Sequence, residues 1–208
     1  MERLTVSPTD PQPDALTRAA DCLLRGRLVV FPTDTLYGLA ADPRNADAVA
    51  RVYRAKGRGA AYALPLIAAD IEQVEAAAVR LSPMTRRLAE RFWPGPLTLV
   101  VDAAPAVAVL VHGGTGSVAI RVPDHAVARG LAGRLGFAVV STSANRSGSP
   151  AVSTAAAAVA ELGDDVDLVL DGGPTAGGDS STIVDARADH PRLVRAGAVP
   201  FPRVLEAL

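Results

Sequence analysis

One cationic side chain stands apart in this 208-residue chain, because Lys56 is the single lysine among 21 lysine and arginine residues. It lies in the sequence Lys56-Gly57-Arg58. A lysine ammonium is a compact charge that suits a phosphate or carboxylate at the bottom of a pocket, whereas the planar arginine guanidinium needs space for two parallel contacts. We therefore interpret Lys56 as a candidate ligand-binding cation. The alternative is a cation at a helix C-terminus, a role that arginine fills equally well.

Hydroxyl groups gather in two segments that follow apolar, strand-like runs. The first is Pro32-Thr33-Asp34-Thr35-Leu36-Tyr37-Gly38, which either binds a small polar ligand or only completes a turn. The second begins at Ser141; if its strand continues, Ser141 and Ser143 project to one face, and Asn145 adds two donors and an acceptor. That polar density is typical of phosphate or ribose binding, with a serine-rich loop as the alternative. Weaker candidates are scattered at Ser117, Arg121, Ser181, Thr182 and Arg195.

Strand-like and helix-like runs alternate along the chain, which predicts an α/β fold with a mixed, twisted sheet. Strands are expected at residues 28–31, 64–68, 97–101, 118–122, 138–141, 168–170, 183–184 and 193–194. Helices are expected at residues 14–25, 46–56, 84–92, 125–135 and 154–162, with Asn45, Ser82, Asp124 and Ser153 as N-caps, and a short helix follows Pro200. Open α/β sheets bind ligands beyond their strand ends, where the polar segments fall.

Composition narrows the class of protein. Hydrophobic residues make up 49% of the chain, which suits one compact domain. The net charge of -1 lacks the cation excess of a general nucleic-acid binder, so we expect any RNA contact to be local. The single cysteine, Cys22, is expected to be a buried thiol and is compatible with a reducing compartment. Because neither a signal peptide nor a membrane-spanning run is recognisable, we expect a cytoplasmic protein.

Several standard sites are missing from the sequence. The three histidines, His112, His125 and His190, have no metal-ligand spacing to one another or to the cysteine. No glycine-flanked serine nucleophile, P-loop or dinucleotide fingerprint occurs. We therefore predict no protein-held metal site, and we expect any nucleotide to be bound by an unconventional arrangement.

Taken in order, a series of motifs resembles the YrdC/TsaC family of threonylcarbamoyl-AMP synthases from about residue 16 to residue 195. The motifs are Pro32-Thr33-Asp34-Thr35-Leu36-Tyr37-Gly38-Leu39, Lys56-Gly57-Arg58, Trp93-Pro94-Gly95-Pro96-Leu97-Thr98, Arg121-Val122-Pro123, Ser141-Thr142-Ser143-Ala144-Asn145, Ser147-Gly148 and Ser181-Thr182-Ile183-Val184-Asp185. Each motif alone is unspecific, whereas the full set in this order is hard to obtain by chance.

The resemblance implies a single YrdC-like domain over residues 1–208, in which a twisted open sheet with flanking helices surrounds a deep, positively lined cavity. We expect no additional C-terminal domain of the kind found in longer members. The implied reaction joins L-threonine, bicarbonate and ATP into L-threonylcarbamoyladenylate and releases pyrophosphate. This nucleotidyltransferase activity would supply threonylcarbamoylation of the adenosine beside the anticodon of tRNA, through a downstream tRNA-modifying complex.

The same resemblance assigns the site residues. It places Thr35, Arg121, Ser141 and Ser181 around threonine, with Arg121 as the partner of the carboxylate. It places Lys56, Arg58, Ser117, Ser143, Asn145 and Arg195 around ATP. Lys56 and Arg58 are the candidates for neutralising the negative charge that grows during catalysis, with Mg2+ bridging the phosphates of ATP.

The chain departs from the family pattern after Arg58. Gly59 follows where a proline is common, Leu64-Pro65-Leu66 replaces an Asn-Pro-Leu step, and Ala69 stands where a histidine is common. Two alternative functions follow from the sequence: a paralogue that uses another substrate in the same pocket, and an RNA-binding accessory protein of tRNA or ribosome maturation. Threonine-dependent pyrophosphate release separates the enzyme from both.

Overall fold

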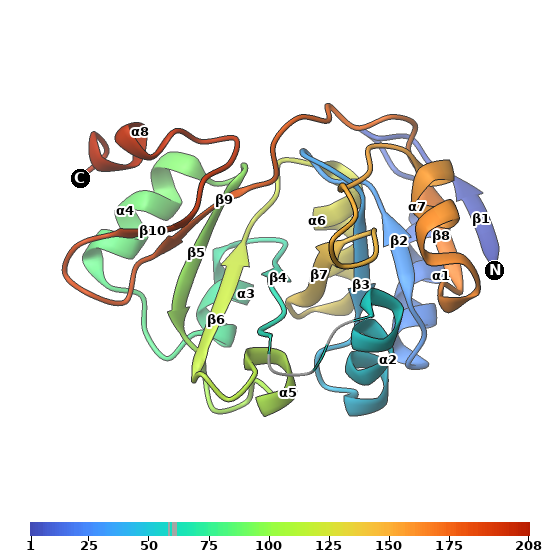
Figure 1. Cartoon of the computed structure of the whole chain (residues 1–208), viewed down its shortest axis with the longest axis horizontal. Helices are drawn as coiled ribbons and strands as arrows, with labels where there is room; N and C mark the ends of the chain where they lie inside the picture. Colours follow the sequence, from blue (N-terminus) through green and yellow to red (C-terminus); the bar gives the residue numbers. More distant parts are fainter. Residues whose placement is uncertain (58, 60–61) are drawn as a thin grey trace.

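The structure is a computed structural model that describes residues 1–57, 59 and 62–208. Within these residues, ten strands form one sheet in the order β1-β8-β2-β3-β7-β4-β6-β5-β9-β10 (Figure 1). The strands are β1 (Glu2–Thr5), β2 (Val29–Phe31), β3 (Gly38–Ala41), β4 (Leu66–Ile67), β5 (Leu97–Asp102), β6 (Ser117–Arg121), β7 (Val139–Ser143), β8 (Leu168–Asp171), β9 (Thr182–Asp185) and β10 (Arg192–Arg195). Parallel and antiparallel pairs both occur, so the predicted mixed α/β sheet is confirmed.

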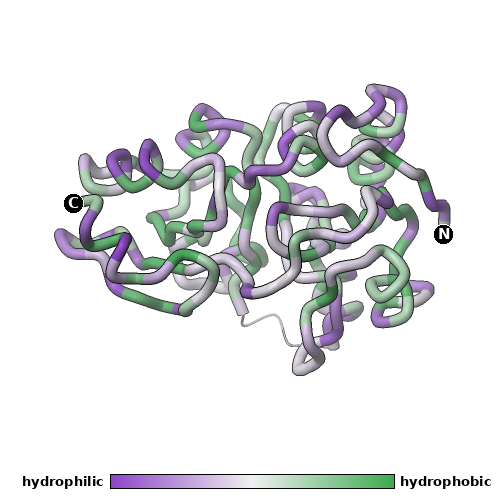
Figure 2. Tube along the Cα trace, turned by 90° about the horizontal axis from the view of Figure 1, so that it is seen from above, coloured by the Kyte–Doolittle hydropathy of each residue, from purple (hydrophilic) through white to green (hydrophobic). Residues whose placement is uncertain are grey.

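Helices flank the sheet on both sides. They are α1 (Pro13–Leu24), α2 (Ala46–Lys56), α3 (Ile71–Ala77), α4 (Pro83–Phe92), α5 (Val109–His112), α6 (Ala126–Leu135), α7 (Ala155–Leu162), the 3-10 helix η1 (Gly163–Asp165) and α8 (Phe201–Leu205). Apolar residues of α1 and α6 join one hydrophobic cluster, whereas those of α2, α4 and α7 join a second cluster on the opposite face. Figure 2 shows the two termini at opposite ends of the molecule, with hydrophobic stretches running through the segments between them.

Helix α2 shows how local sequence fixes the position of the single lysine. The Asn45 side chain accepts hydrogen bonds from the backbone amides of Asp47 and Ala48, which confirms it as the N-cap. Gly57 ends the helix in the left-handed conformation, with φ of 63°, which glycine adopts without steric cost. Lys56 is therefore the last helical residue, immediately before the Gly57 terminus.

Two of the predicted N-caps are wrong. Helix α6 is preceded by His125 rather than Asp124, and no side chain caps it. Helix α7 is capped by Thr154, whose hydroxyl accepts from the amide of Ala157, rather than by Ser153. Ser153 and Thr154 both carry a hydroxyl that can cap a helix, and helix ends commonly shift by one residue from the expected position.

Several elements escaped the sequence analysis. Strands β1 and β3 and helices α3 and α5 were not predicted, and β4 is shorter than expected. The predicted buried thiol is confirmed: Cys22 is 9% exposed, and burial, followed by the charge of Asp167, raises its pKa to about 11. No helix in residues 1–57, 59 and 62–208 combines the length and hydrophobicity needed to cross a membrane.

Candidate active site

A cavity of about 460 Å3 lies over the central strands, beyond the part of the sheet that α1 and α6 cover. Its walls come from the β2–β3 connection, from the C-terminal end of α2, from β6 and β7, and from the segments around β9 and β10. The described lining residues with polar side chains are Thr33, Thr35, Tyr37, Lys56, Thr98, Arg121, Ser141, Thr142, Ser143, Asn145, Ser147, Ser180, Ser181 and Arg195. The positively lined cavity that the sequence predicted is therefore present.

Strand register explains why hydroxyls face this cavity. Ser141 pairs with Ala40 and Ser143 pairs with Gly38, so both serines project from the same face of β7. Strand β7 extends beyond the expected end at residue 141 to Ser143, so the condition under which Ser141 and Ser143 were expected to share a face is met. Gly38 leaves the necessary room, because a Cβ at this position would lie 3.2 Å from the Ser141 hydroxyl and 3.0 Å from the ring of Phe31.

Lys56 faces the cavity, as predicted, but its ammonium also holds the protein together. Its Nζ donates hydrogen bonds of 2.6 Å to the backbone carbonyl oxygens of Ser143 and Asn145, and lies 3.3 Å from the Ser143 hydroxyl and 3.2 Å from Asn145 Oδ1. The residue is 3% exposed. The backbone carbonyl of Lys56 in turn accepts from the Ser147 amide at 2.9 Å. Lys56 thus supplies positive charge and fixes the loop that follows β7.

Arg121 lies at the end of β6, in a buried salt bridge with Asp34. Its Nη1 donates to Asp34 Oδ1 at 2.7 Å, and the two side chains are 9% and 10% exposed. Its Nη2 lies 3.4 Å from the Thr33 hydroxyl and 3.3 Å from the Thr35 hydroxyl. Asp34 therefore fixes the direction of the guanidinium. Within the described residues, the second carboxylate oxygen of Asp34 has no hydrogen-bond partner.

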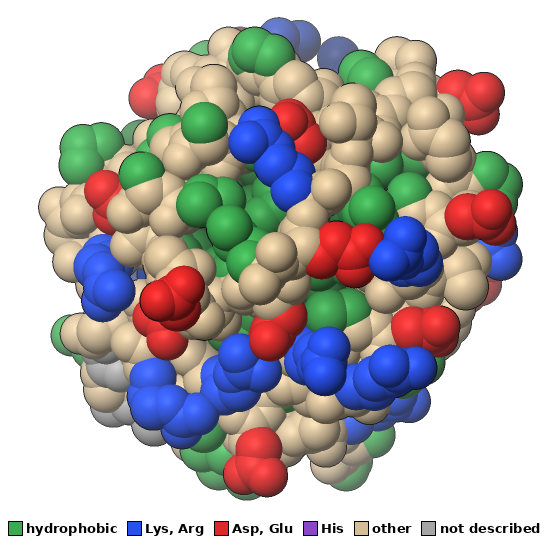
Figure 3. Space-filling model, turned by 90° about the vertical axis from the view of Figure 1, so that its right-hand side faces the viewer, with side chains coloured by type: hydrophobic (Ala, Val, Ile, Leu, Met, Phe, Trp, Pro, Cys, Tyr) green, Lys and Arg blue, Asp and Glu red, His purple; other side chains and the backbone are tan. Residues whose placement is uncertain are grey.

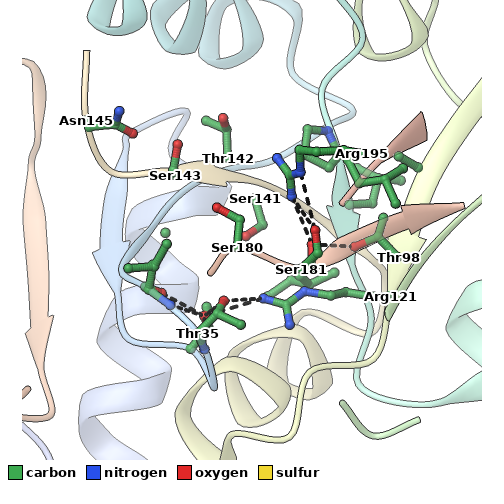
Figure 4. Close-up of a pocket in the computed structure, with 18 of the residues that line it drawn as sticks. Thr35, Thr98, Arg121, Ser141, Thr142, Ser143, Asn145, Ser180, Ser181 and Arg195 are labelled. Atoms are coloured by element: carbon green, nitrogen blue, oxygen red, sulfur yellow. Dashed lines mark hydrogen bonds between the residues drawn. The ribbon is translucent and has the colours of Figure 1, made fainter. Parts of the chain in front are cut away.

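Arg195 supplies a second guanidinium from β10. In Figure 4, Arg195 and Arg121 lie on opposite sides of Ser181. Its Nη2 donates to the Ser181 carbonyl oxygen at 2.7 Å and to the hydroxyl at 3.2 Å. No salt bridge to Arg195 is found among the described residues. Burial and the charge of Arg121 both lower the pKa of Arg195. Two cations that repel each other favour an anion between them.

The cavity has the electrostatics of an anion site. Lys56, Arg121 and Arg195 line it, whereas no aspartate or glutamate is among its described lining residues. In the described part of the chain, no group of three histidine, cysteine or acidic residues is placed to hold a metal ion. The arrangement is suited to binding phosphates and carboxylates through cations, hydroxyls and the Asn145 amide.

The structure brings together most of the predicted site residues and leaves two aside. Thr35, Lys56, Arg121, Ser141, Ser143, Asn145, Ser181 and Arg195 all line the cavity. Ser117 is missing from the described lining; it begins β6, two residues before Ala119 on the face that carries Arg121, and its hydroxyl lies 3.1 Å from that of Thr115. Arg58 lies outside the described residues.

Sequence reasoning assigned no site role to several contributors, of which Thr98, Ser180 and Asp34 matter most to the geometry. Thr98 lines the cavity although it was expected only as part of a family motif and not as a site residue, and Ser180 precedes the predicted Ser181. Asp34 lies behind Arg121 and shapes the site without lining it. Thr98 is the one hydroxyl-bearing residue of strand β5, between the buried Leu97 and Leu99. A polar residue inside an apolar strand was the available signal, and it is a weak one.

A family model described as Telomere recombination, covering the Sua5, YciO and YrdC proteins, matches residues 21–197. The chain belongs to this family. The family and fold class expected from the sequence motifs are thereby confirmed.

Relatives within the Sua5/YciO/YrdC family include a threonylcarbamoyl-AMP synthase of Bacillus subtilis, 38% identical over 195 residues, which are 93% of this chain and 56% of that protein. A threonylcarbamoyl-AMP synthase of Thiobacillus denitrificans is 44% identical over 134 residues, 64% of this chain and 71% of that protein. The crystal structure of Pyrococcus abyssi Sua5 complexed with L-threonine superimposes with a TM-score of 0.95 at 34% identity, over 100% of this chain and 61% of that one. The chain thus spans just over half of the longer relatives.

Proposed function

We propose that the protein is an L-threonylcarbamoyladenylate synthase, which joins L-threonine, bicarbonate and ATP with release of pyrophosphate. The observation that carries the proposal is the convergence of Lys56, Arg121 and Arg195 on one cavity that hydroxyls line and acidic side chains do not. Such a cavity suits an amino-acid carboxylate and a triphosphate at the same time. The names of the relatives, and the threonine bound to Sua5 of Pyrococcus abyssi, agree with this choice of substrates.

The proposed chemistry needs no covalent nucleophile. The threonine amine and bicarbonate or CO2 give a carbamate, and water is released when bicarbonate is the source. A carbamate oxygen then attacks the α-phosphorus of ATP, a new P–O bond forms, and the bond to the β-phosphate oxygen breaks so that pyrophosphate leaves. The protein contributes alignment and neutralisation of negative charge, which together account for large rate effects in phosphoryl-type transfers.

Each cavity wall takes a role in this scheme. Arg121, held by Asp34, binds the threonine carboxylate, with the hydroxyls of Thr35, Ser141 and Ser181 around the amino acid. The ATP phosphates and ribose lie toward Lys56, Ser143, Asn145 and Arg195. The family resemblance adds Arg58 and Ser117 to this group. In this scheme Lys56 acts partly through the loop that it fixes, because two of its three donors point at backbone carbonyls.

Mg2+ belongs to this scheme as a partner of ATP. The described lining offers hydroxyl and amide oxygens but no carboxylate, which is a poor set of ligands for a resident Mg2+ ion. The ion is therefore proposed to enter with the nucleotide, held mainly by phosphate oxygens, where it neutralises phosphate charge. The protein is proposed to act in the cytoplasm, where its product would pass to a tRNA-modifying transferase complex.

The proposal is tested by pyrophosphate release from purified protein with ATP, Mg2+, bicarbonate and each amino acid in turn. Threonine-dependent release, with L-threonylcarbamoyladenylate identified by mass spectrometry, is the expected result. Arg121→Met should abolish most of the release, whereas Arg203→Met, at an exposed position of α8, should leave it unchanged. Release that requires a different amino acid would replace the substrate assignment and favour the paralogue.

Salt-sensitive RNA binding without turnover would favour the accessory-protein alternative. The charge pattern of one face weighs against it: in Figure 3, acidic side chains lie among the basic ones that gather in the lower half of the surface seen from the side of β1 and α7, so this face is not uniformly basic. Several arginines of the described chain are in salt bridges, among them Arg3 with Asp171, Arg51 with Asp167 and Arg146 with Asp165. A phosphate backbone needs unpaired cations gathered on one face.

A further inference from the structure

The hydroxyl of Ser181 is held from two sides at the cavity wall. Its Oγ lies 2.8 Å from the Thr98 hydroxyl on β5 and 3.2 Å from Nη2 of Arg195 on β10 (Figure 4). Thr98 is 3% exposed and Ser181 is 8% exposed, so neither hydroxyl turns freely toward solvent. A hydroxyl with two hydrogen-bond partners, one of them the buried Thr98, has few orientations left for a ligand.

The direction of these hydrogen bonds decides whether the Ser181 hydroxyl presents a donor or an acceptor to a ligand. Arg195 only donates, so it occupies one lone pair of the Ser181 oxygen. When Thr98 donates as well, the second lone pair is occupied and the Ser181 hydrogen points to the ligand. If Ser181 instead donated to Thr98, the Ser181 oxygen would present an acceptor to the ligand. That acceptor would lie beside the guanidinium groups of Arg195 and Arg121, which attract anions. An anionic ligand needs a donor, which favours the chain Thr98 to Ser181 to ligand.

The backbone of Ser181 is fixed by the segment after β10. Val199 exchanges two hydrogen bonds with the hydroxyl of Thr182, its amide donating at 2.9 Å and its carbonyl accepting at 2.6 Å. Gly197 allows this approach, because a Cβ there would lie 2.6 Å from the Ser181 carbonyl carbon and 2.7 Å from the Thr182 nitrogen. These are backbone atoms, so an added methyl group must displace the peptide itself.

We propose that Thr98 and Gly197 are positioning residues for the Ser181 hydroxyl. Thr98 sets the direction of its hydrogen, and Gly197 sets the position of the peptide that carries it. The inference rests on the proposed function in one respect, namely that Ser181 contacts the amino-acid substrate. Gly197 is not among the described lining residues, and the Thr98 hydroxyl is engaged with Ser181 Oγ, so both are proposed to act through Ser181.

Thr98→Val tests the first part, because valine keeps the branched shape and removes only the hydroxyl. The KM for threonine should rise roughly 3- to 12-fold, the worth of one hydrogen bond, while the KM for ATP stays within about twofold. Thr98→Ser restores a hydroxyl and should recover most of the threonine affinity. A merely structural role would lower the fraction of active protein, and therefore kcat, without separating the two KM values.

Gly197→Ala tests the second part against a matched glycine. The added methyl group should lower kcat/KM for threonine about 10- to 100-fold, because a displacement of order 1 Å disturbs substrate alignment. Gly133→Ala is the control: it lies on the exposed side of α6, where a Cβ would meet only Ala69 at 3.7 Å. This control should keep wild-type kinetics. Thermal melting and circular dichroism establish that each variant is folded.

Crystal structures of Thr98→Val and Gly197→Ala separate this inference from the proposed function. We expect the Ser181 hydroxyl to rotate in the first variant and its peptide to move in the second. An unmoved Ser181 in both structures, or unchanged threonine KM in folded Thr98→Val, would overturn the inference. A wild-type protein that turns over no amino acid would overturn the proposed function instead, and the crystal structures would then decide the positioning roles by themselves.

Discussion

The ammonium of Lys56 donates a hydrogen bond of 2.6 Å to the backbone carbonyl oxygen of Asn145, a residue that follows it by 89 positions in the chain. This contact ties the C-terminal end of α2 to the loop after β7, where the predicted nucleotide contacts lie. An ammonium has three donors, and two of them point at backbone carbonyls in this structure. The charge of Lys56 and the shape of the nucleotide site are therefore linked.

Replacing Lys56 with alanine should lower kcat/KM for pyrophosphate release by roughly 30- to 1000-fold, or about 2 to 4 kcal/mol. The change removes a buried positive charge and leaves two carbonyl groups without their donor. Steady-state pyrophosphate release measures the effect. Arg54→Ala, an exposed cation in the last turn of the same helix, is the control and should stay within about twofold. Pyrophosphate release at the wild-type rate would remove Lys56 from the mechanism.

Replacing Asp34 with asparagine should destabilise the protein by about 3 kcal/mol, because it leaves the buried charge of Arg121 uncompensated. Urea unfolding at neutral pH measures the change. The threonine KM should rise as well, since the Arg121 guanidinium loses the partner that fixes its direction. Asp10→Asn provides the comparison: Asp10 is exposed and forms no salt bridge within the described residues. Equal stability of the two variants would show that the Asp34 carboxylate has no such role.

Triphosphate binding should stabilise the wild-type protein and depend on Arg195, which has no acidic partner in the described chain. Mg-ATP at about 100 times its dissociation constant adds about 2.7 kcal/mol, which corresponds to a rise in Tm of roughly 5 to 10 °C for a chain of this size. Differential scanning fluorimetry measures it. Arg195→Met should lose most of the rise, whereas Arg203→Met should keep it. An undiminished rise in Arg195→Met would place the phosphates elsewhere.

Acid should weaken the end of β9 through Asp185. The Arg187 guanidinium holds the pKa of this carboxyl well below its usual range, and Arg192 donates a further hydrogen bond. A carboxyl with a lower pKa in the folded state stabilises the fold fully above its unfolded pKa, about 4, and loses that contribution as pH falls toward the folded value. Asp185→Asn should therefore cost about 1.5 to 3 kcal/mol at pH 7.

Urea unfolding of wild type and Asp185→Asn between pH 7 and pH 3 tests this dependence. The difference in unfolding free energy should be constant from pH 7 to about pH 5 and should shrink below about pH 4. Asp10→Asn supplies the reference curve for an exposed carboxylate. A difference between wild type and Asp185→Asn that grew on acidification would contradict the assignment.

Local signals predicted the elements that carry strong caps or long apolar runs. The Asn45 cap and the Gly57 terminus define α2, and the apolar run before Ser141 defines β7. The Asp124 and Ser153 caps were wrong because the adjacent residues begin those helices. Strand β3 was missed because Gly38–Ala41 is small and apolar, with no periodicity, and is a strand only through its pairs with β2 and β7.

Cavity-lining residues were predictable where their chemistry was unusual in the sequence. Lys56 is unique, and the hydroxyls of Ser141 and Ser143 recur at strand spacing. Thr98 and Asp34 carried no comparable signal, since an isolated threonine in a strand and an aspartate in a turn are common. Their importance comes from Ser181 and Arg121, which lie 83 and 87 positions away along the chain.

The sequence by itself determined the α/β class, the family motifs and the concentration of cations and hydroxyls at the ends of strands, because these depend on neighbouring residues and on spacing along one chain. Only the tertiary structure decided which partner each group has: that Lys56 donates to backbone carbonyls, that Arg121 is neutralised by Asp34, and that Arg195 is left to face the cavity. Charge compensation is a property of atoms a few ångströms apart in space, and sheet order, which long-range strand pairing sets, brings those atoms together.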